Sequence, residues 1–301
     1  MARPPVIGVD VGGTKMNAAL VDEQGALEGA VTRQTPTGSQ DEFLAGLTGL
    51  VEEMRDNRAA ALGLGLPSTI DQHGGRAVSS VNIPLADVGV RGLMEQRFGL
   101  PVAIDNDGNA AAIAEWKVGA GRGTRDMIML TLGTGIGGGL ILGGKPFRGA
   151  SGSAAELGHM VLQYGGPRCQ GTCQGTGHFE MLASGRAADD AAKRLLGGDA
   201  SGAELVEAAR EGDAECVEAL AEIGRRLGAG IASLVNIFEP ERVVLGGGFG
   251  QSWELLIGPA REVVAREALP PGRDTVRIVP AELGPRAGLV GAGFVAYEAL
   301  D

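Results

Sequence analysis

Residues Ile128 to Leu142 read IMLTLGTGIGGGLIL, which is an apolar segment, a polar residue, a glycine-rich tip and a second apolar segment. The same layout occupies Val6 to Val21, read VIGVDVGGTKMNAALV. Asp10 and Thr131 are the polar residues of the two copies, and aligning them aligns both tips at a constant offset of 121 residues. Short apolar runs rich in β-branched residues around glycines are typical of β-hairpins. A hairpin module that occurs twice predicts two similar α/β lobes, with a nucleotide in the cleft between them.

The glycine tips are candidate phosphate-binding turns. In the first copy the tip is Gly12-Gly13-Thr14-Lys15, and its uncovered backbone amides are suited to phosphate oxygens, while Asp10 is placed to orient a hydrated magnesium ion. The matching positions of the second copy are Thr131 and Gly133. A glycine hairpin that binds nothing is the alternative. Neither copy has the form of a P-loop, and neither runs from a strand into a helix as a dinucleotide-binding fingerprint does, so both of those readings are disfavoured.

A third glycine cluster follows a predicted strand at Glu241 to Leu245. It consists of Gly246, Gly247 and Gly248, where bare backbone permits the close approach of a flat or bulky group. We expect the adenine end of a nucleotide to lie there.

The segment Glu156 to Glu180, read ELGHMVLQYGGPRCQGTCQGTGHFE, contains two of the three cysteines and two of the three histidines. These four residues are His159, Cys169, Cys173 and His178. Two imidazoles and two thiolates are the ligand set of a closed tetrahedral zinc site, and Glu156 and Glu180 bracket that set. The alternative is a glycine-rich loop in which cysteine and histidine occur by chance.

Two polar segments follow predicted strands. The strand Ala61 to Leu66 leads into PSTIDQHGGRAVSSVNIP, which we expect to be a loop, and its Asn82 is suited to a hydroxylated ligand or is a turn asparagine. The strand Pro101 to Ile104 ends at the run Asp105-Asn106-Asp107-Gly108-Asn109, directly before a predicted helix at Ala110 to Trp116. One of these polar residues is a candidate cap for that helix.

The other predicted elements are packing elements. Apolar spacing predicts helices over Glu42 to Met54, Leu93 to Phe98, Ala187 to Leu196, Ala203 to Val235, Arg261 to Leu269 and Ala287 to Leu300, and a strand over Val276 to Pro280. Cys216 lies beside one apolar stripe and is interpreted as a small core residue rather than a reactive thiol.

Composition and charge exclude several classes of protein. The 301 residues suggest one large or two modest domains, and 44% hydrophobic content is enough for sizeable cores. With 26 Lys and Arg against 37 Asp and Glu, the net charge of −11 disfavours nucleic acid as a partner. No run approaches the ~18 apolar residues of a membrane span, and the chain starts without a signal-peptide core, so we expect a cytoplasmic protein without a membrane partner.

With these residues assembled, the chain resembles the ROK family of sugar kinases and related repressors, and within it the glucokinases. The motifs that carry the resemblance are Asp10-Val11-Gly12-Gly13-Thr14-Lys15, Asn106-Asp107-Gly108-Asn109, Gly133-Thr134-Gly135-Ile136-Gly137-Gly138-Gly139, Glu156-Leu157-Gly158-His159, the segment Cys169 to Glu180 and Leu245-Gly246-Gly247-Gly248. The resemblance implies a two-lobed, actin-like (ribonuclease H-like) ATPase fold. We expect a smaller α/β lobe over 1–112, to which a helix over 286–301 returns, and a larger α/β lobe over 113–285 with the zinc loop.

The resemblance also implies ligands and site residues. ATP with Mg²⁺ would lie between the lobes and a hexose in front of its γ-phosphate, in a protein that forms a dimer or tetramer. The implied hexose contacts are Asn82, Asn106, Asp107, Glu156, His159 and Glu180, and the implied phosphate contacts are near Gly12, Thr14, Lys15, Thr134 and Gly135.

Three positions depart from the family's pattern. Ser68 stands where Pro-Gly is usual in the sugar-side loop, and Gly108 replaces the usual Ala. Cys169 and Cys173 are separated by three residues where one is common, and His178 occupies the place of a third cysteine. Water or a carboxylate is the alternative to His178 as the fourth zinc ligand.

We therefore expect transfer of the γ-phosphoryl group of ATP to the 6-hydroxyl of glucose, giving glucose 6-phosphate, with Asp107 as general base. Mannose, an N-acetylated hexosamine or fructose are the alternative acceptors. A sugar-responsive ROK repressor would carry an added N-terminal helix-turn-helix, whereas here the first hairpin begins at Val6. A chaperone or filament ATPase of the same broad fold would not need the Glu156 to Glu180 constellation.

Overall fold

The computed structural model describes residues 2–171 and 173–301 and divides into two compact units. The first unit contains the chain up to Gly123 together with Gly139–Ala155 and Glu282–Asp301, and the second contains Thr124–Gly138 and Glu156–Ala281. This division differs from the predicted boundary at residue 112, because helix α3 runs without a break from Asp107 to Val118.

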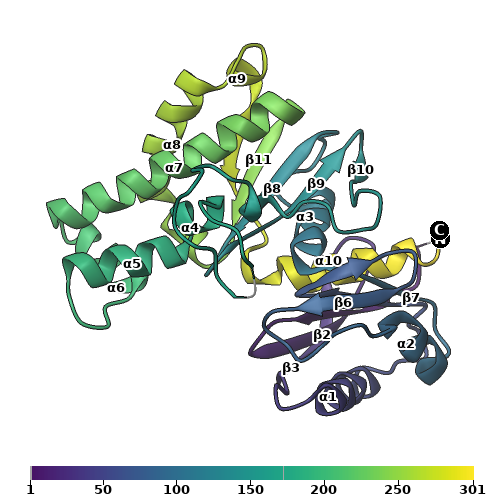
Figure 1. The fold of residues 1–301 in the computed structure, drawn as a ribbon. Coiled ribbons are helices and arrows are strands. Elements are labelled where there is room, and N and C mark those ends of the chain that lie inside the picture. Colours follow the sequence, from purple (N-terminus) through teal and green to yellow (C-terminus); the bar gives the residue numbers. More distant parts are fainter. Residues whose placement is uncertain (1, 172) are drawn as a thin grey trace. The chain divides into compact units, whose positions relative to one another are not determined.

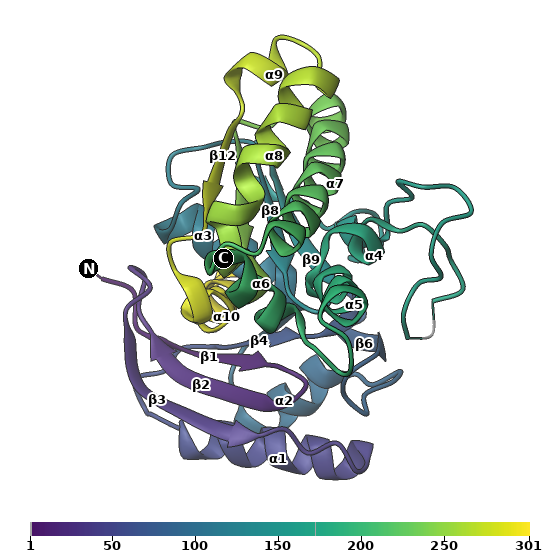
Figure 2. The same cartoon turned by 90° about the vertical axis from the view of Figure 1, so that its left-hand side faces the viewer.

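The sheet of the first unit has the strand order β3-β2-β1-β4-β7. Its strands are β1 (Val6–Val11), β2 (Lys15–Val21), β3 (Leu27–Gln34), β4 (Leu62–Leu66) and β7 (Val102–Asn106). Strands β1, β2 and β3 form an antiparallel meander, seen side by side in Figure 2, and β4 and β7 continue the sheet in parallel with β1.

The second sheet has the order β10-β9-β8-β11-β12. Its strands are β8 (Met127–Leu132), β9 (Ile136–Leu142), β10 (Lys145–Pro146), β11 (Arg242–Gly246) and β12 (Arg277–Pro280). Each sheet thus consists of three consecutive strands followed by two parallel strands. The predicted α/β class with a repeated hairpin module is confirmed, and the repeat extends over whole sheets.

Helices cover both sheets (Figure 1). The first unit has α1 (Gln40–Glu53), α2 (Val90–Phe98), α3 (Asp107–Val118), η3 (Gly284–Arg286) and α10 (Ala287–Glu298). The second has η1 (Leu157–His159), α4 (Phe179–Ala183), α5 (Gly185–Leu195), α6 (Gly202–Arg210), α7 (Ala214–Phe238), η2 (Phe249–Ser252), α8 (Trp253–Glu267) and α9 (Gly272–Thr275). Among the described residues, none of these helices has the length and hydrophobicity needed to cross a bilayer.

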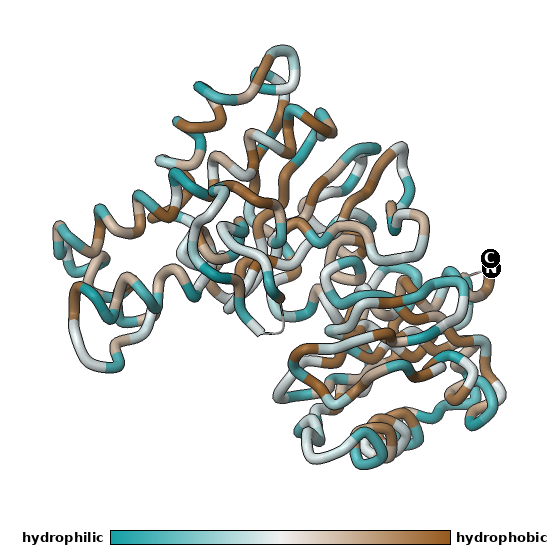
Figure 3. The backbone as a smooth tube through the Cα atoms, in the orientation of Figure 1, coloured by the Kyte–Doolittle hydropathy of each residue, from teal (hydrophilic) through white to brown (hydrophobic). Residues whose placement is uncertain are grey.

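Helix α10 packs into the first unit at glycine positions. A Cβ atom built on Gly63 of β4 would lie 1.9 Å from the carbonyl oxygen of Ala292, and one on Gly291 would lie 1.9 Å from the carbonyl oxygen of Ala110 in α3. Backbones this close leave no room for a side chain. Helix α1 has one apolar face, on which Phe43 and Leu47 are fully buried, and hydrophobic and hydrophilic residues alternate along it in Figure 3.

The structure differs from the sequence analysis in three places. The polar segment after β4 is not a plain loop but the hairpin β5 (Ser68–Asp71) and β6 (Arg76–Ser80). Strand β3 was not predicted, because it lies at the sheet edge with mostly exposed side chains and so lacks an apolar pattern. Helix α8 begins at Trp253, eight residues before the predicted start at Arg261. The sequence analysis missed this first part of the helix because Gly258 and Pro259 are residues that usually interrupt helices.

Candidate functional site

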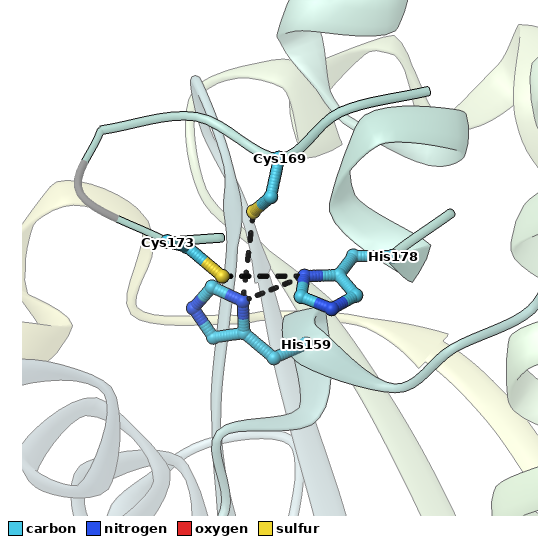
Figure 4. Close-up of side chains that lie close together, drawn as sticks. All are labelled: His159, Cys169, Cys173 and His178. Atoms are coloured by element: carbon cyan, nitrogen blue, oxygen red, sulfur yellow. Dashed lines mark hydrogen bonds between the residues drawn. The ribbon is translucent and has the colours of Figure 1, made fainter. Parts of the chain in front are cut away.

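Four side chains of the second unit converge on one point (Figure 4). One ligand atom from each of His159, Cys169, Cys173 and His178 lies within 4.8 Å of all the others. The Nδ1 atoms of the two histidines are 3.1 Å apart. Cys169 Sγ lies 3.7 Å from Nδ1 of His159, and Cys173 Sγ lies 3.8 Å from Nδ1 of His178. Chance placement of these residue types in a loop does not predict such convergence.

These distances fit a tetrahedral zinc ion. Zn–N bonds of about 2.0–2.1 Å and Zn–S bonds of about 2.3 Å place two nitrogens roughly 3.4 Å apart and a nitrogen and a sulfur roughly 3.6 Å apart. The measured 3.1, 3.7 and 3.8 Å are close to those values. The cluster is thus compatible with zinc, and both histidines would use Nδ1.

Backbone contacts fold the loop that carries the cluster. Val161 forms a bridge with His178, and Arg168 forms one with Thr176, so the loop closes on itself twice. At Gly177, whose φ is +66°, an added Cβ would lie 1.6 Å from the carbonyl oxygen of Gln163. The glycine is therefore required by this close approach, and part of the glycine richness of the segment serves to bring the ligands together.

Without a metal ion, Cys169 is a neutral thiol. Burial raises the pKa of Cys169 to about 12, and hydrogen bonding to Glu180 acts in the same direction. Its Sγ donates to Oε1 of Glu180 at 3.2 Å. Because zinc binds the thiolate, metal binding at this site must release that proton.

Glu180 lies in the first turn of α4 and is buried. Its Oε2 accepts from the side-chain amide of Gln170 at 3.1 Å and from the backbone N–H of Ile136 at 3.4 Å. Sequence reasoning missed Gln170, whose position inside the cysteine loop was the available signal. Glu156 is exposed at the start of η1, and the residue before it, Ala155, has a φ of +70°, a backbone strain of the kind found at functional sites.

The turn of the second hairpin connects β8 to β9 and contacts the start of α5. The carbonyl oxygens of Gly133 and Thr134 accept from the N–H groups of Gly185 at 2.8 Å and Arg186 at 3.3 Å, and Ser184 Oγ donates to the Thr134 oxygen at 2.9 Å. Those carbonyls are therefore engaged by the protein. A Cβ on Gly133 would meet nothing within 4 Å, so one side of this turn is open.

The third glycine cluster contains two different kinds of glycine. Gly247 has a φ of +85°, and an added Cβ would lie 2.3 Å from the carbonyl oxygen of Leu132, so packing inside the protein explains it. Gly248 faces open space within 4 Å. The packing therefore explains Gly247 without a ligand, and the close approach of a ligand at Gly248 stays a prediction.

In the first unit, Asp10 lies near the end of β1 against α10. A Cβ on Gly288 would come within 2.5 Å of its Oδ1. Burial raises the pKa of the Asp10 carboxyl, and hydrogen bonding to Asn17 opposes this shift. Gly12 N–H donates to the carbonyl oxygen of Lys15 at 2.8 Å and closes the tip of the hairpin.

The polar run Asp105 to Asn109 ends β7 and begins helix α3, so the strand extends two residues beyond the predicted end at Ile104. Asn106 caps it, since its Oδ1 accepts from the N–H groups of Gly108 at 2.9 Å and Asn109 at 3.4 Å. Its amide also donates to the carbonyl oxygen of Ser68 at 3.3 Å. The predicted capping role thus belongs to Asn106, and Asp107 is the first helical residue, with Oδ1 accepting from Gly108 N–H at 2.9 Å.

The predicted site residues divide between the units. Asp10, Gly12, Gly13, Thr14, Lys15, Asn82, Asn106 and Asp107 belong to the first, and Thr131, Gly133, Thr134, Gly135, Glu156, His159, Cys169, Cys173, His178, Glu180, Gly246, Gly247 and Gly248 to the second. Within the first unit, the exposed Asn82 packs against the hairpin tip, because a Cβ on Gly13 would lie 3.1 Å from Asn82 Cβ.

One buried charge network was not predicted. Asp105, which is fully buried, accepts from Arg148 Nε at 2.7 Å and from Asn109 Nδ2 at 3.0 Å. Arg148 also donates to Glu298 of α10 at 2.7 Å. The network holds Asp105 in place next to Asn106, the last residue of β7. Arg148 is 43 residues from Asp105 and 150 residues from Glu298 in the sequence, so no local pattern could have indicated the network.

Comparison with known proteins identifies the family of the chain. Residues 6–299 match the ROK family. A glucokinase from Streptomyces coelicolor is 36% identical over 97% of this chain and 97% of its own length. The crystal structure of a ROK family glucokinase from Streptomyces griseus, in complex with glucose and AMPPNP, has a TM-score of 0.84 and 36% identity over 98% of this chain and 99% of that one. A xylose repressor from Caldicellulosiruptor bescii is 32% identical over 76% of this chain and 60% of the repressor. This chain belongs to the ROK family.

Proposed function

We propose that this protein phosphorylates the 6-hydroxyl of glucose with ATP and releases glucose 6-phosphate and ADP. It is a hexose kinase, a phosphotransferase with an alcohol group as acceptor. The observation that carries the choice of glucose and ATP is its similarity, along nearly the whole chain, to the Streptomyces griseus enzyme solved with glucose and AMPPNP.

In the proposed mechanism Asp107 is the general base. The 6-oxygen of the hexose forms a bond to the γ-phosphorus, the bond from that phosphorus to the ADP oxygen breaks, and the hydroxyl proton passes to the Asp107 carboxylate. Asp107 is half-buried at the start of α3, where its Oδ1 accepts from Gly108 N–H at 2.9 Å. Such a base typically contributes about 10²–10⁴-fold to the rate.

The hexose ring is held by side chains that offer both donors and acceptors. In this proposal these are Asn82, Asn106, Glu156, His159 and Glu180. His159 would bind zinc through Nδ1 and a sugar hydroxyl through Nε2, so the metal would fix the orientation of the ring that contacts the sugar. A site built from polar groups rejects sugars whose hydroxyls point elsewhere, because its buried groups would be left unpaired.

ATP is proposed to bind the two hairpin tips, with its adenine end near Gly248. The donor set of the first hairpin fits magnesium, since Asp10 supplies a carboxylate beside the glycine turn. When bound with ATP, Mg²⁺ neutralises charge on the phosphates. The tip residues Gly12, Gly13, Thr14 and Lys15 would orient the phosphate chain, and positioning supplies most of the rate in phosphoryl transfer.

A panel of sugars tests this proposal. ADP release is measured with ATP and glucose, mannose, N-acetylglucosamine or fructose, each against a reaction without sugar. The proposal expects the highest kcat/KM with glucose. A higher value with another hexose would leave the kinase class intact and overturn the choice of substrate.

A ROK regulator without catalytic activity is the second candidate, supported by the similarity to the xylose repressor from Caldicellulosiruptor bescii. The net charge of −11 disfavours DNA binding. Gel retardation of promoter DNA at physiological salt distinguishes the two. Retardation together with no ADP release for any hexose would establish the regulator instead of the kinase.

A further inference from the structure

Glu180 is held by two N–H donors from two separate segments of the second unit, and in the metal-free protein the Cys169 thiol is a third donor. From the cysteine loop, the Gln170 amide donates to Oε2 at 3.1 Å and Cys169 Sγ donates to Oε1 at 3.2 Å. From the second hairpin, the backbone N–H of Ile136 donates to Oε2 at 3.4 Å. Two N–H donors on one carboxylate oxygen restrict the orientation of the whole group. Gln170 and Ile136 therefore determine where the other oxygen points.

The turn that precedes Ile136 contacts the same group. A Cβ built on Gly135 would lie 2.3 Å from Glu180 Oε2 and 2.8 Å from Gln170 Nε2. The φ of Gly135 lies outside the left-handed region, so backbone conformation does not require glycine there. Glycine at this position instead leaves the space that the carboxylate and the amide occupy.

We propose that Gln170 is a positioning residue for hexose binding, which acts by holding the Glu180 carboxylate against the Gly135–Ile136 turn. This inference rests on the proposed function, in which Glu180 accepts a hydrogen bond from a sugar hydroxyl. The zinc ligands and Gln170 then have separate tasks. The ligands fix the loop, and Gln170 fixes the carboxylate that the loop delivers.

A consequence is that the turn assigned to phosphate binding also sets hexose affinity. Glu180 contacts the turn through Ile136 N–H and through the space above Gly135. A shift of the turn therefore moves the carboxylate even when no nucleotide is bound. Hexose and nucleotide binding are coupled through one side chain.

The first test replaces Gln170 with Leu, which keeps the approximate volume and removes the donor. Loss of a hydrogen bond to a charged group predicts a rise in KM for glucose of about tenfold, with kcat changed by less than about threefold. Zinc content and the midpoint of thermal unfolding should stay at the wild-type values. Gln170→Glu places a second carboxylate beside Glu180 and should raise KM further than Gln170→Leu, an order that loss of packing would not produce.

Gln174→Leu is the matched control, because Gln174 lies in the same loop and its Oε1 accepts from the exposed Arg168 at 3.4 Å. It should keep the wild-type KM for glucose. If Gln170→Leu and Gln170→Glu also keep that KM, the inference is wrong. A wild-type protein that phosphorylates no hexose would instead overturn the proposed function itself.

The second test is independent of the cysteine loop. Gly135→Ala pushes against the flexible end of Glu180, so the fold should persist while the carboxylate moves. Glucose binding is measured by calorimetry without nucleotide, and the expected dissociation constant is about tenfold higher than for the wild type. Unchanged glucose affinity in this variant would show that the turn does not set the position of Glu180, and would overturn the coupling.

Discussion

Asp107 carries the proposed chemistry, and because Asn106 is the cap of α3, that role can be tested apart from helix capping. Asn106 already caps α3, so Asp107→Asn removes a proton acceptor and leaves the cap in place. We expect kcat to fall by about 10²–10⁴-fold while hexose and ATP binding and the midpoint of unfolding change little. Single-turnover rates with saturating glucose and ATP, together with calorimetric affinities, measure this. Activity near the wild-type level would rule out Asp107 as the base.

Asp10 is a second residue whose charge has a measurable cost. Burial raises its carboxyl pKa in the folded state above the unfolded value, so the folded protein binds the proton more tightly. The ionised group therefore lowers stability as pH rises through the folded pKa, and this cost is absent below the unfolded pKa. We expect Asp10→Asn to be more stable than the wild type at pH 7, and equally stable near pH 3, in denaturant titrations without magnesium or nucleotide. A stability difference that does not vary with pH would contradict this.

At the scale of elements, the packing of α10 is a sharp test of the fold. Gly291→Ala places a Cβ 1.9 Å from the carbonyl oxygen of Ala110, so α3 and α10 must separate. We expect a loss of about 3 kcal/mol in the free energy of unfolding, at the upper end of overpacking effects. Gly258→Ala is the control. A Cβ added at this exposed position of α8 would have no atom within 4 Å, and Ala is more favourable than Gly in a helix by about 1 kcal/mol, so this variant should not lose stability. Equal stability of the two variants would contradict the packing.

The sequence predicted some of these elements and not others. The strands β1, β8 and β11 were predicted because they are short apolar runs that end at glycines. The hairpin β5–β6 was not, because its polar residues pair with each other rather than facing a core, as Ser68 and Ser80 do through their hydroxyls. The four metal-ligand candidates were predictable from residue type and spacing. The contacts of Glu180 with Gln170 and Ile136 were not predictable from the sequence. Ile136 lies in the hairpin β8–β9, 44 residues from Glu180, so no local pattern connects the two.

At the scale of the whole molecule, ligand binding should raise stability. A ligand that binds the folded state adds about 2.7 kcal/mol at a concentration of 100 times its dissociation constant. We expect glucose to raise the midpoint of thermal unfolding of the zinc-loaded protein. After chelation, or in a Cys169→Ser, Cys173→Ser double variant, the midpoint should no longer respond to glucose. Elemental analysis that finds no zinc in the active protein would refute the metal's role.

The most direct test of the central claim is phosphorus NMR of a reaction that contains the purified protein, ATP, magnesium and glucose. The account predicts that the γ-phosphate signal is lost as one equivalent each of ADP and glucose 6-phosphate appears, and that ADP release stops when glucose is omitted. Release of ADP at the same rate without sugar, or a phosphate ester at another hydroxyl, would contradict it.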